Sequence, residues 1–291
     1  MRRGGATARR GGATARRGTS HAKRPGPRIG QRVSRALPAP GRIAAVVLTA
    51  ALVGGLLALV NGPWLRVQQI AWAGQHFTEQ RQIERAVSGL KGAALLTVDP
   101  TALARKLQRL PAVSTARVDG RLPNALRIEI VEKVPTFVWQ TSAVRLLGVP
   151  DGTLIGQVAR GSDLPAELAA LPLIDDQRTD SRSTIVGDRI DPISLAAALR
   201  LSAVAPAALG SLSNDVNVRI TDEDGFLLVS TSPAWQADFG FYAPPDSGEL
   251  ATLDEQVSAQ VAAVRTLFAF QSETGVSWVD ARDPGRVYWR P

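Results

Sequence analysis

The residue types that most often carry chemistry are scarce in this chain. It has no cysteine and only two histidines, His21 and His76. Zinc sites and Ser-His-Asp catalysis need these residues at defined places. His21 lies in a low-complexity segment, and His76 lies at a predicted strand–helix junction, where it is expected on the surface. We therefore expect no metal and no cofactor.

The paired carboxylates do not predict an active site either. Asp175-Asp176 and Asp254-Glu255 are adjacent in the sequence. Neighbours point to opposite faces of a strand and do not face each other on a helix. The acidic turn at 222–225 lacks the ligand spacing of a calcium loop, so a solvated turn is favoured. Carboxylates distant in sequence could still assemble a glycosidase site, but we expect a protein that is not an enzyme.

An apolar run, Ile43 to Val60, organises the rest of the chain. It has eighteen residues, no charge, and Thr49 as its only polar side chain. As a helix it would reach about 27 Å, near the thickness of a bilayer core. A buried core helix or a cleaved signal sequence are the alternatives, but the length favours an uncleaved membrane anchor. We predict a transmembrane helix over residues 43–62, with Trp64 at the interface.

Charge predicts how this anchor is oriented. Residues 1–42 contain twelve Lys or Arg and no Asp or Glu, whereas residues 43–291 contain 22 basic and 26 acidic residues. The positive-inside rule then places the N-terminus in the cytoplasm and the remainder outside the cell membrane. The tail repeats the letters RRGGATA and is predicted to be disordered. It could bind anionic lipid or nucleic acid, but it has no aromatic residue for stacking, so no specific nucleic acid is expected.

Residues 64–140 follow a β-α-α-β-β pattern, and the whole chain is predicted to be α+β. Thr78 is a candidate N-cap for the first helix, with Phe77 as a staple residue, and Asp99-Pro100 opens the second helix. Apolar residues at 126, 128 and 130 alternate with Arg127 and Glu129, which predicts a half-buried strand. Residues 136–140 could extend this sheet as an edge.

This stretch resembles the POTRA domain of the FtsQ/DivIB family of bacterial division proteins. Two departures are Ala112, where the family often has an aromatic residue, and Asp119-Gly120. The matching phrases are Val67-Gln-Gln-Ile-Ala-Trp-Ala-Gly74, Leu95-Leu-Thr-Val-Asp99, Leu110-Pro-Ala-Val-Ser-Thr-Ala-Arg-Val118, Leu122-Pro-Asn-Ala-Leu-Arg-Ile128 and Val131-Glu-Lys-Val-Pro135.

Residues 141–291 are predicted to form a mixed β domain with two or more helices. Hairpins are expected around 150–152 and 222–225, and helices over 191–203 and about 250–267. In the first helix, residues 193, 196, 197 and 201 are expected on the inner face. Phe268 and Phe270 are expected in the core. The ending, 277–289, resembles the closing motif of the same family: an Asp-x-Arg, a Pro/Gly turn and a final strand.

The resemblance implies a function as a divisome scaffold at the septum. In the family, the C-terminal strand region receives the bitopic proteins FtsB and FtsL, and the POTRA domain serves recruitment of other division proteins at the inner membrane. A final strand with an unpaired edge could accept a partner strand. A membrane-anchored cell-wall hydrolase or wall-binding protein is the alternative function. By position in the closing motif, the candidate contacts are Arg282, Gly285, Val287, Tyr288 and Trp289.

Overall fold

The computed structural model describes residues 40–242, 251–283 and 285–291. Within them the chain is α+β, which confirms the predicted class. The chain divides into two units, residues 1–53 and 54–291, and each is described by itself. The tail that we predicted to be disordered lies outside the described residues, except for residues 40–42.

Helix α1 (Pro40–Asn61) is almost entirely apolar. Its residues Gly41–Ala58 are long and apolar enough to cross a membrane, and no other helix in the described ranges meets both criteria. The large side chains of this helix are exposed, with Leu52 at 66%. In α1 the main-chain hydrogen bonds are made within the helix itself, as the interior of a bilayer requires. The helix begins at Pro40, three residues before the predicted start.

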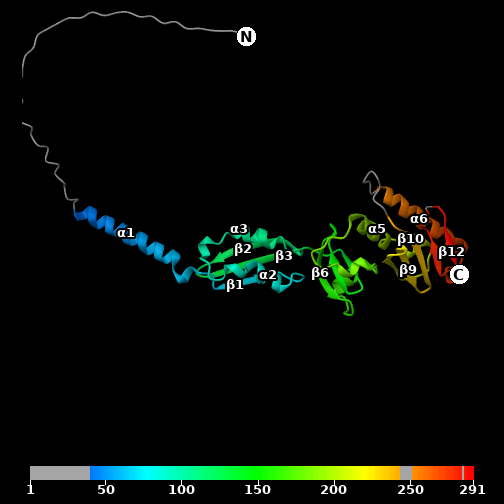
Figure 1. Ribbon diagram of the computed structural model, residues 1–291, viewed down its shortest axis with the longest axis horizontal. Helices are drawn as coiled ribbons and strands as arrows, with labels where there is room; N and C mark the ends of the chain where they lie inside the picture. The colour runs from blue at the N-terminus through cyan, green and yellow to red at the C-terminus, as the bar shows by residue number, and fades with distance from the viewer. Residues whose placement is uncertain (1–39, 243–250, 284) are drawn as a thin grey trace, which may run out of the picture. The chain divides into compact units, whose positions relative to one another are not determined.

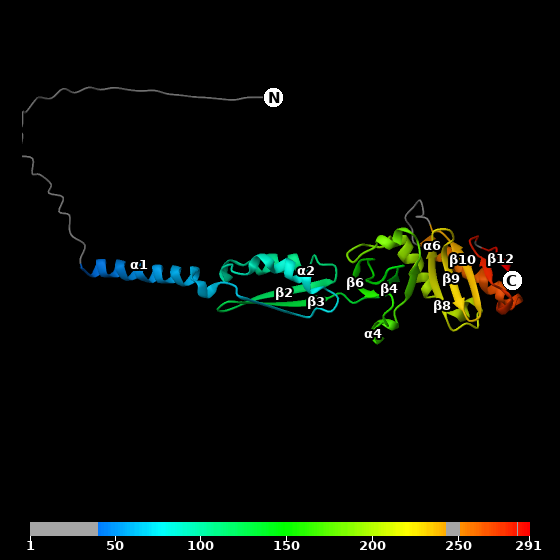
Figure 2. The ribbon, with the colours of Figure 1, turned by 60° about the horizontal axis from the view of Figure 1, so that its bottom comes forward.

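The β-α-α-β-β pattern folds into a three-stranded sheet of order β1-β3-β2. Strand β3 runs parallel to β1 and antiparallel to β2. Figure 2 shows α2 and α3 on one face of this sheet. Its elements are β1 (Gln69–Ala73), α2 (Gln80–Val87), α3 (Pro100–Leu107), β2 (Val113–Arg121) and β3 (Ala125–Glu132), with short 3-10 turns at Pro63–Leu65, Ser88–Leu90 and Leu95–Thr97.

The alternation predicted for β3 is confirmed. Leu126, Ile128 and Ile130 are buried beneath the helices, whereas Arg127 and Glu129 are exposed on the other face. Since a strand alternates its side chains between two faces, one face of this small sheet builds the core and the other meets solvent.

The two helix starts have different outcomes. Asp99 caps α3, with Pro100 at the first helical position. Its side chain accepts hydrogen bonds from the main-chain N–H groups of Thr101 and Ala102. The predicted cap at Thr78 is wrong, because α2 begins at Gln80 and its N-cap position is Glu79, which makes no side-chain cap. Instead, the N–H of Thr78 donates to the carboxylate of Glu132.

The rest of the described chain forms a nine-stranded sheet of order β12-β11-β10-β9-β8-β7-β4-β5-β6. Figure 1 shows β12 near the C-terminal end of the chain. The strands are β4 (Phe137–Gln140), β5 (Val144–Gly148), β6 (Leu154–Ala159), β7 (Leu173–Asp176), β8 (Val216–Thr221), β9 (Gly225–Thr231), β10 (Ala234–Gly240), β11 (Trp278–Asp280) and β12 (Tyr288–Arg290).

Strand β4 overturns one prediction. Residues 136–140 do not extend the three-stranded sheet, because β4 pairs with β5 on one side and with β7 on the other. All four of its residues are buried. A strand that is covered on both faces reads as a continuous apolar run, and such a run fits the middle of a sheet better than an edge.

Helices α5 (Pro192–Ser202) and α6 (Ala251–Phe270) pack against the nine-stranded sheet over one core (Figure 1). A one-turn helix, α4, covers Ala166–Ala169, and 3-10 turns lie at Asp180–Ser183, Pro206–Leu209 and Glu273–Gly275. The predicted hairpins and both helices are confirmed. Leu250, which we placed on the long helix, lies outside the described residues.

Two details of these helices differ from the prediction. In α5 the buried residues are Leu195, Ala197, Ala198 and Leu201, whereas positions 193 and 196 are half-buried. In α6, Phe268 packs against Trp235, as expected for core, but Phe270 is 88% exposed. Phe270 is the last residue of α6, and at this end of the helix its side chain remains in contact with solvent.

Candidate functional site

Strand β12, like β6 at the other end, is one of the two end strands of the nine-stranded sheet. It pairs antiparallel with β11, with Tyr288 opposite Asp280 and Trp289 opposite Val279, and it has no other strand partner in the described part of the chain. In an antiparallel pair only alternate main-chain groups face the neighbouring strand. The remaining N–H and C=O groups of β12 therefore point away from the sheet, where another strand could pair with them.

The side chains of β12 differ on its two faces. Trp289 lies on the core side, because its partner Val279 is fully buried, and Val287 packs against the same core. Tyr288 lies on the opposite face. Both aromatic residues remain accessible, Tyr288 at 59% and Trp289 at 40%. Neither has been absorbed into the core, so both can contact a partner at this edge.

The turn before β12 contains the other two candidates. Gly285 is exposed with a φ of +82°, a left-handed conformation that favours glycine. A Cβ at Gly285 would meet no atom within 4 Å, so the residue serves the shape of the turn. Arg282, by contrast, makes hydrogen bonds within the protein through both its side chain and its main chain.

The side chain of Arg282 holds two carboxylates. Its Nε donates to Asp280 Oδ1 at 2.9 Å, and its second arm reaches the other oxygen of Asp280. The same Nε lies 3.5 Å from Asp238 Oδ2. Asp238 lies on β10, directly opposite Asp280 on β11. Gly240 leaves room for this arginine, because a Cβ there would lie 3.0 Å from Arg282 Cγ.

The main chain of Arg282 is held from the helix side. Gln260 on α6 is fully buried, and its Nε2 donates to the carbonyls of Phe239 at 2.9 Å and of Arg282 at 3.3 Å. Tyr242 donates its hydroxyl to Gln260 Oε1 at 2.8 Å. The preceding residue, Ala281, donates its N–H to the carbonyl of Asp238 at 2.8 Å. We call Asp238, Asp280, Arg282 and Gln260 the Arg282 clamp.

Burial shifts the acidity of this cluster. Asp238 is 1% exposed, and burial raises its pKa to about 6, although the Gly240 N–H and the Arg282 charge oppose the change. Burial also raises the pKa of Tyr242, with the nearby Asp238 charge adding to the effect. The hydrogen bond from Arg282 lowers the pKa of Asp280. The cluster thus contains one carboxylate that titrates near neutrality and one that stays ionised.

Sequence reasoning missed the residues that support Arg282. Gln260 carried a signal, because it is a polar residue within the apolar stripe that includes Val257 and Val264. Asp238 carried a weaker one, as a carboxylate inside a predicted strand. Neither signal indicates that the residue contacts Arg282, since β10, α6 and β11 come together only through tertiary packing.

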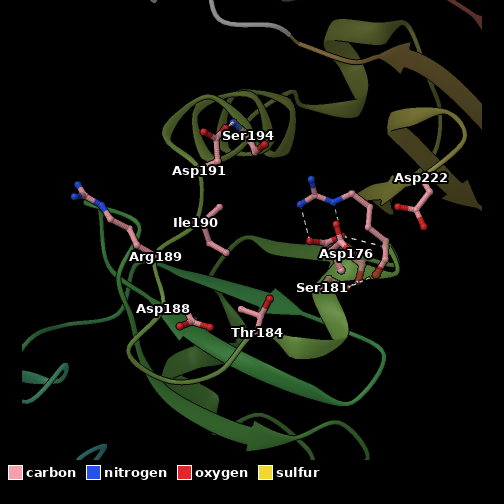
Figure 3. Close-up of a pocket in the computed structure, with 11 residues that line it drawn as sticks. Asp176, Ser181, Thr184, Asp188, Arg189, Ile190, Asp191, Ser194 and Asp222 are labelled. Atoms are coloured by element: carbon pink, nitrogen blue, oxygen red, sulfur yellow. Dashed lines mark hydrogen bonds and ion pairs between the residues drawn. The ribbon is translucent and has the colours of Figure 1, made fainter.

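A second candidate is a hollow of about 380 Å³ beside the start of α5 (Figure 3). Four of its carboxylates already accept hydrogen bonds from the protein: Asp176, Asp188, Asp191 and Asp222. These groups brace turns and cap a helix. No cluster of three or more histidine and carboxylate side chains among the described residues is arranged to hold a metal ion. The arrangement is that of a structural polar network.

The comparisons with known proteins agree on one family. A family model described as "POTRA domain, FtsQ-type" matches residues 65–133, which include β1, α2, α3, β2 and β3. Several curated relatives are named cell division protein FtsQ, including the following three. The relative from Mycobacteroides abscessus is 29% identical over 63% of this chain and 56% of its own length. That from Chloroflexus aurantiacus is 32% identical over 50% of each chain, and that from Streptomyces collinus is 25% identical over 62% and 70%.

The fold and the family match define a POTRA-domain protein with one apolar helix ahead of that domain. Its POTRA domain is of the FtsQ type, and the curated relatives that the chain resembles are cell division proteins named FtsQ. The predicted resemblance is therefore confirmed, and with the apolar helix it indicates a single-pass membrane protein. The chain spans about half the length of the first two relatives, so the partners and activity of the whole protein are matters for proposal.

Proposed function

We propose that this protein is a non-enzymatic divisome scaffold that binds an FtsB/FtsL-type complex by strand addition at β12, and so helps control septal peptidoglycan synthesis by other enzymes. One observation carries the proposal: β12 ends the nine-stranded sheet and has a free edge within the described residues. Strand addition draws affinity from main-chain hydrogen bonds and selectivity from alternate side chains.

The contact surface that we propose consists of five residues: Arg282, Gly285, Val287, Tyr288 and Trp289. Tyr288 and Trp289 supply accessible aromatic area of the kind that anchors interfaces. Gly285 gives the turn its shape, and Val287 leads into the strand from the core side. Arg282 belongs to this surface through its position at the start of the turn.

We also propose the placement of the whole chain. Residues 1–42 form a cytoplasmic tail and residues 43–62 cross the cell membrane, with the N-terminus inside and the remainder outside, at the division septum. Residues 64–140 serve as the POTRA domain, which contacts other divisome proteins, and residues 141–291 serve as the partner-binding domain. The pairing of β4 with β5 and β7 supports moving the border between these two domains to about residue 135.

A test of strand addition uses the full-length chain in detergent micelles, co-purified with the FtsB/FtsL-type pair of the same bacterium. Val287→Pro removes an N–H beside the free edge, whereas the control Val287→Ala shortens the side chain and keeps the N–H. We expect the proline variant to lose the pair and the alanine variant to retain it. Equal recovery of the pair by both variants, with unchanged circular dichroism, would reject strand addition at β12.

A further inference from the structure

The strand that we propose as the partner site has few contacts of its own. Strand β12 pairs with β11 over three residues only. In the turn before it, the Arg286 N–H donates to the Asp283 carbonyl, and at the end of the strand the Ser277 N–H and Oγ donate to the carbonyls of Arg290 and Pro291. A two-strand ladder of this length adds little order by itself. These bonds lie in the turn and at the far end of the strand, so the residue at which the chain leaves β11 needs a support of its own.

Arg282 makes hydrogen bonds or ion pairs on both faces of the sheet. On the face of the sheet opposite α6, its guanidinium bridges Asp280 and the buried Asp238. On the helix-covered face, its carbonyl accepts a hydrogen bond from Gln260, which is itself held by Tyr242. The clamp thus connects β10, β11 and α6 at the residue where the chain turns toward β12. Bidentate arginine–carboxylate bonding adds geometric specificity as well as attraction.

We infer that the Arg282 clamp positions β12 for its partner, so that Arg282 supports binding by holding the strand in place. This inference rests on the proposed partner site, and it names the residues that hold that site in place. Arg286, in the same turn, is exposed and forms no ion pair with any described residue. The two arginines therefore differ in one respect that an experiment can use: only Arg282 is tied to the body of the sheet.

The clamp also contains a group that titrates near neutrality. The charged and titratable groups that act on Asp238 are Asp280 at the end of β11, Arg282 just after it, Asp224 in the β8–β9 turn, and Tyr242 after β10. Its neighbour on β9, Leu227, carries no charge. When Asp238 takes up a proton, Arg282 loses one of its two carboxylate partners. Partner binding should then weaken as pH falls from 7 to 5.

The contribution of Asp238 to the stability of the fold changes in the opposite direction. The folded protein holds the Asp238 proton more tightly than the unfolded chain, because burial raises its pKa. Protonation at pH 5 therefore favours the fold while it loosens the clamp. A residue with a purely structural role would make binding follow stability. Opposite pH trends for binding and for stability are the signature of a positioning role.

The experiment compares Arg282→Gln with Arg286→Gln in the full chain in detergent micelles. The first measurement needs no partner: hydrogen exchange at residues 286–291. We expect faster exchange in Arg282→Gln only, with the POTRA domain unchanged. The second is affinity for the co-expressed FtsB/FtsL-type pair, where we expect a loss of about tenfold in Arg282→Gln and little change in Arg286→Gln. The third is the pH profile of binding, which Asp238→Asn should flatten.

Each outcome has one meaning. Weaker binding by Arg282→Gln with unchanged exchange at 286–291 would show that Arg282 acts by contact alone and does not position β12, which would overturn the inference. Equal losses in both arginine variants would also overturn it, because charge alone would then explain them. If the wild-type chain fails to bind the pair, the proposed function fails, while the exchange measurement still tests the clamp.

Discussion

The carboxylate of Glu132 accepts the main-chain N–H of Thr78 at 2.8 Å, although 54 residues separate them. The same carboxylate also accepts the N–H groups of His76 and Phe77, at 2.7 and 2.8 Å. Three consecutive donors at the approach to α2 are thus satisfied by the end of β3. This single side chain replaces the local cap that the sequence around Thr78 led us to expect.

Replacing Glu132 should destabilise the POTRA domain. Burial raises the pKa of Glu132, but the hydrogen bonds from residues 76–78 outweigh it and lower the pKa overall. Its stabilising contribution is therefore present above about pH 4.5 and is lost as pH falls below that value. We expect Glu132→Gln to cost about 1–3 kcal/mol at pH 7 and the difference from wild type to shrink toward pH 3. Urea unfolding at several pH values measures this, and a difference that is constant with pH would contradict it.

Asp176 should matter more than its neighbour Asp175. Asp176 is buried and accepts hydrogen bonds from Trp139 Nε1 at 3.0 Å and from both arms of Arg178. We expect Asp176→Asn to cost about 2–3 kcal/mol, because a partly buried guanidinium loses its counter-charge. Asp175→Asn is the matched control, since its ion pairs with Arg219 and Arg160 are long and partly exposed, and we expect less than about 1 kcal/mol. Equal effects in thermal unfolding would show that burial does not decide the cost.

The raised pKa of Asp238 leads us to expect an unusual pH dependence of stability. Its pKa is about 6 in the folded protein against an ordinary value of 3.8, so the contribution of Asp238 to the stability of wild type is lost as pH rises from about 4 to 6. Asp238→Asn cannot titrate. Its stability relative to wild type should therefore increase over this range by at most about 3 kcal/mol, since one pKa unit corresponds to about 1.4 kcal/mol. Unfolding midpoints at pH 4, 6 and 8 test this, and a relative stability that falls with pH would refute the assignment.

The orientation in the membrane can be tested with introduced cysteines, because the chain has none of its own. We expect Ser162→Cys to react with a membrane-impermeant maleimide in intact spheroplasts, and Ser20→Cys to react only after permeabilisation. The physical reason is the excess of Lys and Arg before the apolar helix. The cysteine-free parent chain is the control for background. Labelling in the reverse order would overturn the proposed topology.

Local periodicity was enough to predict most elements of the fold. Alternation in β3, the Asp99 cap and the turn between β5 and β6 each follow from a few neighbouring residues, and all three are confirmed. The start of α2 was wrong because its donors are satisfied by Glu132, far along the chain. Strand β4 was misplaced because its parallel partner β7 is distant in sequence.

The candidate site was predictable to a similar extent. The turn at Gly285 and the aromatic strand after it are visible in the sequence, and the structure places them at the end of the sheet. What could not be predicted is the clamp on Arg282. It requires Asp238 and Gln260, which are 44 and 22 residues away along the chain and come near only when α6 crosses over the sheet.

The order of strands in the large sheet has a consequence for assembly. Strands β8 to β12 occupy successive places, so each new strand docks on the one before it. Strand β11 lies parallel to β10 and reaches it only after α6 has folded back across the sheet. A polypeptide interrupted within α6 would keep its apolar helix and its POTRA domain but would lack the docking edge. In the function that we propose, recruitment through that edge would report that folding of the C-terminal domain is complete.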